Sequence, residues 1–468
     1  MNSKSKKLMN NTILFFIGSV GSKFIQFLLV PLYTYTLTNE DFGVSDIVFT
    51  TINFLIPIFS IQVTDGLLRF GLDKKEDKNK VINSTFRILL IGSIFSIIFS
   101  PLLMISSTLK SWIPYLIIIL NLRIYRDVFS IILKIDDKNK LFAVDSILYT
   151  LILCLSSLLL LVVFKIGISG YFFSYIIANS FSIIFIIIVS RMNIRDIKKS
   201  KDGSVLKRLL FYSAPLVINS ISYWITTASD RYMVNYYSGP ADVGLYAIAA
   251  KIPTIVTTFT GVFSQAWLIS SISEVDNKEN SKFYSATLLN YMYISFIFCS
   301  LIIAFIKPFM SIYVSNSYYI AWKSSILLIL SAVFSGLCSF LNGIYYAYKK
   351  NITVTITTII GAIINIFLNV ILINKFGIVG AAIATLISWI IIYILKIVFL
   401  KRFINMNTNN RFCFICTFLV LLEIISLYYF STLISFIINI LISFIIIFYC
   451  RKFILKILSS LLKKLGRK

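Results

Sequence analysis

Long apolar blocks alternate with short polar segments along the whole chain. Two examples are YLIIILNLRIY, which begins at Tyr115, and LILCLSSLLLLVVF, which begins at Leu151. A run of about 20 apolar residues is long enough to cross the hydrocarbon core of a bilayer as an α-helix. The pattern predicts fourteen such spans, at residues 8–37, 43–65, 82–106, 112–134, 141–164, 168–190, 209–237, 243–269, 284–306, 323–348, 353–373, 378–400, 411–430 and 433–450.

These elements predict an all-α polytopic membrane protein. All the connections are short, so no loop is long enough to hold a separate soluble domain. The basic start MNSKSKKLMNN runs straight into an apolar stretch without a small-residue cleavage site. We therefore interpret residues 8–37 as a first membrane span and not as a cleaved signal sequence.

Composition and charge agree with this class. The 468 residues are 58% hydrophobic and 13% charged, against about 25% charged in a typical soluble domain. The net charge of +25 does not indicate nucleic-acid binding, because the basic residues are spread thinly between the apolar spans. Most of the basic residues outside the spans lie in segments on the same side of the membrane as the N-terminus. Because positive residues stay on the cytoplasmic side, this predicts a bacterial cytoplasmic membrane protein with both termini in the cytoplasm. Twelve spans plus two re-entrant or surface helices at the C-terminal end would keep this alternation.

Metal, redox and enzymatic chemistry find little support. All six cysteines lie in apolar runs, and the one CxxC pair, Cys413 and Cys416, falls inside a predicted membrane helix. The chain has no histidine, which removes the commonest catalytic base and metal ligand. It also has no G-x-x-x-x-G-K-[ST] loop for ATP. We expect no catalytic residues, no metal and no cofactor.

Two short motifs recur in the same order in both halves. Residues 39–47, NEDFGVSDI, match 240–248, PADVGLYAI, through D-x-G, and residues 165–174, KIGISGYFFS, match 375–384, KFGIVGAAIA, through K-x-G-I-x-G. Six spans per copy return the chain to the same side, so the repeats are parallel. We predict a six-helix lobe at 1–200, a second at 201–402, and an added two-helix segment with a basic tail at 403–468.

This arrangement resembles the multidrug/oligosaccharidyl-lipid/polysaccharide exporter superfamily, and within it the polysaccharide biosynthesis proteins that flip lipid-linked oligosaccharides. The most specific stretches are SAPLVINSISYWITTASDRYMVNYYSGPADVGLYAIAAKI at 213–252 and FGIVGAAIAT at 376–385. The resemblance implies two six-helix lobes around a central cavity, lined largely by spans 1, 2, 7 and 8. It also implies transport by alternating access.

Charged side chains inside the spans supply the candidate site. A charge at bilayer depth costs about 2.5–3.5 kcal/mol on insertion scales, so it marks a functional or paired site. A lipid-linked oligosaccharide carries a phosphate or pyrophosphate, and moving that anion through the membrane requires fixed positive charge. Arginine suits phosphate because its guanidinium is planar and presents a fork of N–H donors. We therefore predict a cationic substrate-binding cavity formed by Lys23, Arg123, Arg126, Arg231 and Lys251.

Each candidate also has a structural interpretation. Arg69, Arg87 and Lys396 lie near the cytoplasmic ends, where long side chains can snorkel. Asp127 stands at i+4 from Arg123 and can pair with it, and Asp230 can brace Arg231 against a neighbouring helix. Tyrosine and tryptophan are common at membrane interfaces whatever the function. The secondary candidates, which would contact charge or glycan, are Arg69, Asp127, Asp230, Asn219, Tyr223, Trp224, Asn235 and Gln265.

The predicted function is translocation of an undecaprenyl-(pyro)phosphate-linked oligosaccharide to the outer face of the membrane, for capsule or O-antigen type polysaccharide. The expected partners are this substrate, the bilayer, and a polysaccharide polymerase or glycosyltransferases. A peptidoglycan lipid-precursor flippase would also need a cationic cavity, so charge alone does not exclude it. A cation-coupled multidrug exporter would need membrane carboxylates. Asp46 and Asp65 lie near the ends of their span, and the other candidates are Asp127, Asp145 and Asp230. A membrane polymerase or ligase would need a long outer loop, which the chain lacks.

Overall fold

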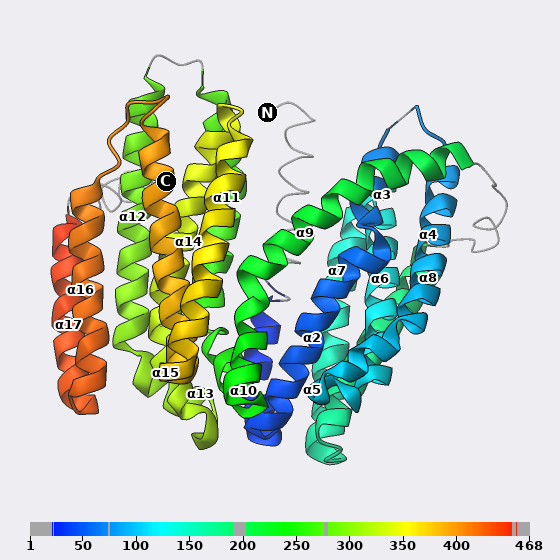
Figure 1. Ribbon diagram of the computed structural model, residues 1–468, viewed down its shortest axis with the longest axis horizontal. Helices are drawn as coiled ribbons and strands as arrows, with labels where there is room; N and C mark the ends of the chain where they lie inside the picture. Colours follow the sequence, from blue (N-terminus) through cyan, green and yellow to red (C-terminus); the bar gives the residue numbers. More distant parts are fainter. Residues whose placement is uncertain are drawn as a thin grey trace, which may run out of the picture. The chain divides into compact units, whose positions relative to one another are not determined.

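The computed structural model describes residues 21, 23–73, 75–190, 203–275, 279–451 and 455. Within these ranges the chain is helical almost throughout and forms no strand, which confirms the predicted all-α class. Ten of the helices described there are long and apolar enough to cross a membrane, so the chain is a multi-pass membrane protein. The number fourteen stays a prediction. Figure 1 follows the elements in chain order from blue to red.

The chain divides by its internal contacts into two compact units. Unit 1 comprises Met1–Asn235 and Gly239–Gly244, and unit 2 comprises Tyr236–Ser238 and Leu245–Lys468. Residues 23–36 of unit 1 are helical. They are followed by α2 (Asn39–Ser60), α3 (Val63–Gly71), α4 (Lys78–Ile98), η1 (Ser100–Ile105), α5 (Ser107–Lys110), α6 (Ile113–Ile135), α7 (Asn139–Ser157), η2 (Leu158–Val163), α8 (Ile168–Ser190) and most of α9 (Gly203–Ser238).

Local sequence fixes several of these helix starts. Thr38 caps α2, where its Oγ1 accepts the backbone N–H of Asp41 at 3.1 Å. Asp77 caps α4 in the same way, because its Oδ1 accepts the N–H of Asn79 at 2.9 Å. Such caps satisfy backbone donors that have no partner inside the helix, and acidic residues favour the positive N-terminal end.

The D-x-G motifs at residues 41–43 and 242–244 meet in unit 1. A Cβ added at Gly43 would overlap the backbone of Pro240 at the start of α10 (Pro240–Ala249), and one added at Gly244 would overlap the backbone of Asn39. Each position requires glycine because of the other, since a Cβ added at either glycine would also lie within 3.1 Å of the other glycine's backbone nitrogen. Backbones can approach this closely only where neither residue carries a side chain.

Unit 2 is built around one deeply buried helix. Its elements are the end of α10, α11 (Pro253–Ser273), α12 (Asn280–Ala304), α13 (Ile306–Tyr313), η4 (Asn316–Ala321), α14 (Trp322–Ala347), α15 (Asn351–Leu400), α16 (Asn410–Tyr429) and α17 (Thr432–Tyr449). Most of the apolar window that contains α14 is buried inside the protein, so this helix forms the core of the unit. The helices α16 and α17 lie side by side (Figure 1).

Two helical breaks in unit 2 follow from single residues. The predicted span at 243–269 is divided, because α10 ends at Ala249 and α11 begins at Pro253. Pro253 has no N–H to offer the Ala249 carbonyl, and the Ser325 hydroxyl of α14 donates to that carbonyl instead at 3.1 Å. Within α15, Gly377 adopts φ 54° and ψ −135°, a conformation open essentially to glycine alone. The predicted spans at 353–373 and 378–400 lie on either side of it.

Candidate functional site

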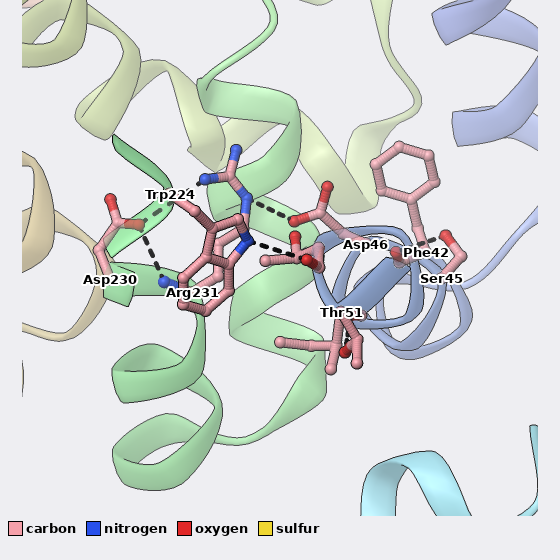
Figure 2. A network of polar contacts seen from close by, with 9 residues as sticks. Phe42, Ser45, Asp46, Thr51, Trp224, Asp230 and Arg231 are labelled. Carbon is pink, nitrogen blue, oxygen red and sulfur yellow. Dashed lines mark hydrogen bonds and ion pairs between the residues drawn. The ribbon is translucent and has the colours of Figure 1, made fainter. Parts of the chain in front are cut away.

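The C-terminal half of α9 is joined to α2 by an ion-pair network in unit 1 (Figure 2). The Nε–H of Arg231 donates to Oδ2 of Asp46 at 2.7 Å, and an Arg231 terminal nitrogen lies 3.7 Å from Oδ1 of Asp230. All three side chains are less than one fifth exposed. One guanidinium therefore faces two carboxylates, and the interhelical brace expected of this pair is made by Arg231 to Asp46.

Further contacts extend this α9–α2 association along the helices. The indole N–H of Trp224 donates to the Thr50 carbonyl at 2.9 Å, and the Tyr232 hydroxyl lies 2.5 Å from Thr51 Oγ1. The Asn235 amide donates to Thr108 Oγ1 of α5 at 3.1 Å. Trp224 and Asn235, which the sequence suggested as glycan contacts, thus each hold a polar partner within unit 1.

On α6, Arg126 lies in a network between three helices of unit 1. Its Nε–H donates to Ser182 Oγ of α8 at 2.8 Å, and a terminal nitrogen lies 3.4 Å from Oδ2 of Asp145 on α7. The guanidinium carbon also lies 3.7 Å above the Tyr149 ring. Asp145 is 1% exposed and accepts the Ser182 hydroxyl at 2.5 Å. This network satisfies the charge and several donors of Arg126 from within the unit.

One turn earlier, Arg123 has a different environment. A terminal N–H donates to Oδ1 of Asn53 on α2 at 2.8 Å, and the side chain is half-buried. Among the described residues it forms no ion pair, and the expected pair with Asp127 is not made. Asp127 is itself half-buried on the same helix. Arg123 therefore presents a guanidinium that is held by a neutral amide and, among the described residues, has no carboxylate within ion-pair distance, while Asp127 interacts with it electrostatically over a longer range.

The other basic candidates are spread over the chain. Lys23 is exposed on the first described helix, and Lys251 is half-buried at the break between α10 and α11 in unit 2. Arg69 on α3 has a side chain that is 61% exposed and lies 3.9 Å from Asp73. The side chains of Asn219, Tyr223 and Gln265 lie outside the described part of the structure.

The snorkelling interpretation of Lys396 is wrong. Its side chain is buried in unit 2 at 1% exposure, where the ammonium donates to Thr357 Oγ1 at 2.8 Å. The ammonium nitrogen also lies 5.7 Å from the centre of the Tyr345 ring. Both partners lie in unit 2, Thr357 in the first half of α15 and Tyr345 on α14, so Lys396 joins helices inside the protein and does not reach for the interface.

Glu423 is a further membrane carboxylate, which the sequence-based predictions did not include. This residue is fully buried on α16, and its Oε1 accepts the Ser300 hydroxyl of α12 at 2.5 Å. The signal was present in the sequence, since Glu423 is the acidic residue within the apolar run FCFICTFLVLLEIISLYY. A charged residue inside such a run is by default a candidate site.

The chain matches one protein-family model. The family model described as polysaccharide biosynthesis protein matches residues 8–274. No curated protein matches the chain.

Several solved structures share the fold. A structure described as the lipid II flippase MurJ in an inward closed conformation is 19% identical, with a TM-score of 0.70, covering 95% of this chain and 100% of its own. An inward-facing multidrug resistance transporter of the MATE family is 14% identical, with a TM-score of 0.67 and coverage of 81% and 95%. A transporter of the MOP superfamily from Pyrococcus furiosus, described as having a binding pocket of reverse polarity, is 14% identical, with a TM-score of 0.56 and coverage of 85% and 96%.

Proposed function

The chain belongs to the polysaccharide biosynthesis protein family, and from this premise we propose that it translocates an undecaprenyl-(pyro)phosphate-linked oligosaccharide across the cytoplasmic membrane by alternating access. The product would serve capsule or O-antigen type polysaccharide on the cell surface. Both termini lie in the cytoplasm in this proposal, and a polysaccharide polymerase or glycosyltransferases act beside the protein.

The environment of Arg123 carries the proposal. A guanidinium has five N–H donors, and the described contacts of Arg123 use one of its terminal nitrogens for the neutral Asn53. The remaining donors and the positive charge can meet a phosphate oxygen pair in the planar fork that arginine prefers. Arg126 and Arg231 already face carboxylates, so we assign them to holding helices together and assign the anion contact to Arg123.

The structural neighbours are compatible with this chemistry but do not define the substrate. One is described as a lipid II flippase, which supports a lipid-linked substrate and keeps the peptidoglycan precursor as an alternative. The MATE neighbours support the cation-coupled drug exporter as the second candidate. A specific observation favours that second candidate, because Asp46 and Asp230 both face Arg231 and so place two membrane carboxylates in one cluster, the groups that cation coupling needs.

Substitution of Arg123 tests the proposal. Arg123→Gln in the native host should lower surface polysaccharide about tenfold or more, because a charged hydrogen bond contributes about 1.5–3 kcal/mol. Arg123→Lys should restore part of the output, since it keeps the charge without the fork. The matched control is Arg411→Gln, which removes an exposed arginine from the start of α16 and should leave output unchanged.

The readouts separate the candidates. Surface carbohydrate is released and quantified, membrane levels of each variant are measured by immunoblot, and lipid-linked oligosaccharide is extracted to show whether it accumulates. Wild-type output from Arg123→Glu at normal protein level would refute the anion assignment. Loss of ethidium efflux in Asp46→Asn, together with normal efflux in Arg123→Gln, would establish the drug-exporter candidate instead.

A further inference from the structure

A polar seam runs through the C-terminal helices of unit 2. The helix α17 is strongly apolar, yet Ser435, Asn439 and Ser443 recur on it at every fourth position and are all buried. Residues four apart lie on one face of a helix, so these three form a single line. The facing helix α16 contributes two more buried polar residues, Glu423 and Ser426.

Glu423 is the centre of this seam. Its Oε1 accepts the Ser300 hydroxyl at 2.5 Å and the Ser443 hydroxyl at 3.3 Å, and the two serine oxygens lie 2.7 Å apart. Its Oε2 is buried and has no hydrogen-bond partner in the described part of the chain. A carboxyl oxygen that is shut away from water and left without a donor is costly, so the site is incomplete as it stands.

The charge environment of this carboxyl is given by the described part of the chain. The described Lys and Arg residues make no ion pair with Glu423. Lys307 of α13 comes near α16 but donates its ammonium to the Leu427 carbonyl at 2.8 Å. The helices packed against α16 carry ten titratable side chains: Lys282, Tyr284, Tyr291, Tyr293 and Cys299 on α12, Lys323, Cys338, Tyr345 and Tyr346 on α14, and Tyr449 on α17. Of these, the Cys299 thiol interacts with the Glu423 carboxyl.

The neighbouring amide shows what is missing. The Ser426 oxygen lies 2.8 Å from the Glu423 backbone carbonyl oxygen and 2.5 Å from Oδ1 of Asn439. Both of these oxygens are acceptors, but the serine has one hydroxyl proton to donate. The amide nitrogen of Asn439, Nδ2, is buried and has no acceptor in the described part of the chain. With the amide turned end for end, Asn439 Nδ2 donates to Ser426 and the serine donates to the carbonyl. Both unpartnered atoms of the seam are then acceptors, and what they need is a hydrogen.

We propose that Glu423 binds one proton at Oε2 from solution and releases it during the transport cycle, so that α16 and α17 give this transporter its proton site. The hydroxyls of Ser300 and Ser443 already contact Oε1, which leaves Oε2 as the oxygen that takes the proton. A bound metal ion would need several free oxygen ligands. The described residues contain no group of metal-ligating side chains, and one free oxygen suits a proton.

Infrared difference spectroscopy tests the binding step without any transport substrate. The full-length protein is reconstituted in phosphatidylcholine bilayers, and spectra are recorded between acidic and alkaline buffers in H2O and D2O. One component of the protonated-carboxyl absorption should titrate in the wild type and in Glu279→Gln, an exposed matched control. That component should be absent from Glu423→Gln, while the absorption of the other carboxyls remains. Coincident spectra of wild type and Glu423→Gln would overturn the proposal. Loss of the band on adding NaCl but not KCl at constant pH would overturn it in favour of a sodium site.

Export measurements test whether the proton is used. Glutamine keeps the size and hydrogen bonding of Glu423 but cannot exchange a proton, so Glu423→Gln should lose most surface polysaccharide while Glu423→Asp and Glu279→Gln retain it. Full export by Glu423→Gln would show a purely structural residue and refute the proposal. The inference does not rest on the assigned substrate, because the infrared band is expected whether or not the protein carries an oligosaccharide.

Discussion

The ion pair between Arg126 and Asp145 offers a direct test of what the arginines of α6 do. Arg126→Leu removes the guanidinium but leaves Asp145 almost fully buried, with the Ser182 hydroxyl still donating to it. Removing one partner of a buried pair costs about 3–5 kcal/mol, because the other charge loses its compensation. We expect a loss of that size in the free energy of unfolding.

The double variant separates a structural role from a substrate contact. Arg126→Leu with Asp145→Asn removes both charges, so the cost should fall below about 2 kcal/mol, most of it from lost hydrogen bonds. Asp145→Asn also breaks the pair, so the coupling energy should exceed the roughly 1–3 kcal/mol by which Arg126→Leu alone costs more than the double variant, and a coupling of that size marks residues in contact. If the role of Arg126 is to balance Asp145, export by the double variant should return with stability, because neither charge remains.

The assay is a double-mutant cycle on purified protein in detergent micelles. Unfolding is followed by tryptophan fluorescence, and surface polysaccharide is measured in cells for the same four proteins. The structural reasoning fails if Arg126→Leu unfolds like the wild type. It also fails if the double variant is stable but exports nothing, because Arg126 would then contact the substrate itself.

Two further changes probe close packing and a buried charge. Gly43→Ala should lower stability by about 1–3 kcal/mol, because its Cβ would overlap the backbone of Pro240. The control Gly261→Ala should be neutral, because a Cβ there meets open space. Equal thermal midpoints of the two variants would contradict this reasoning. Lys396→Met should be tolerated, because a buried charge gives way to an apolar side chain of similar size, while Thr357→Val should cost about 1–3 kcal/mol by leaving the ammonium without its hydroxyl. The reverse order of these two stabilities would contradict the burial of the ammonium.

The sequence predicted the helical architecture because apolar length and backbone chemistry are both local. The break before Pro253 and the change of direction at Gly377 each follow from a residue type that restricts or frees the backbone. Local sequence could not predict the hydrogen-bond partner of the Ala249 carbonyl, because the donor is Ser325 on a helix far along the chain.

The site was harder to predict for the same reason. Sequence spacing offered Arg123 a partner at i+4, but the structure places Asn53 of another helix closer. Counting residues from the end of a span estimated the depth of Lys396 but not the face of the helix on which it lies. Arg231 and Asp46 are 185 residues apart, so only the fold brings them together.

The contact of Gly43 with Gly244 has a consequence for comparative work on related sequences. Each glycine faces the other segment's backbone, so a larger residue at one position cannot be matched by a smaller one at the other. Compensating exchanges, from which spatial proximity is inferred in aligned relatives, cannot arise at such a pair. The two D-x-G segments would touch without any covariation at these positions, and their proximity would have to be recovered from neighbouring positions that are free to vary.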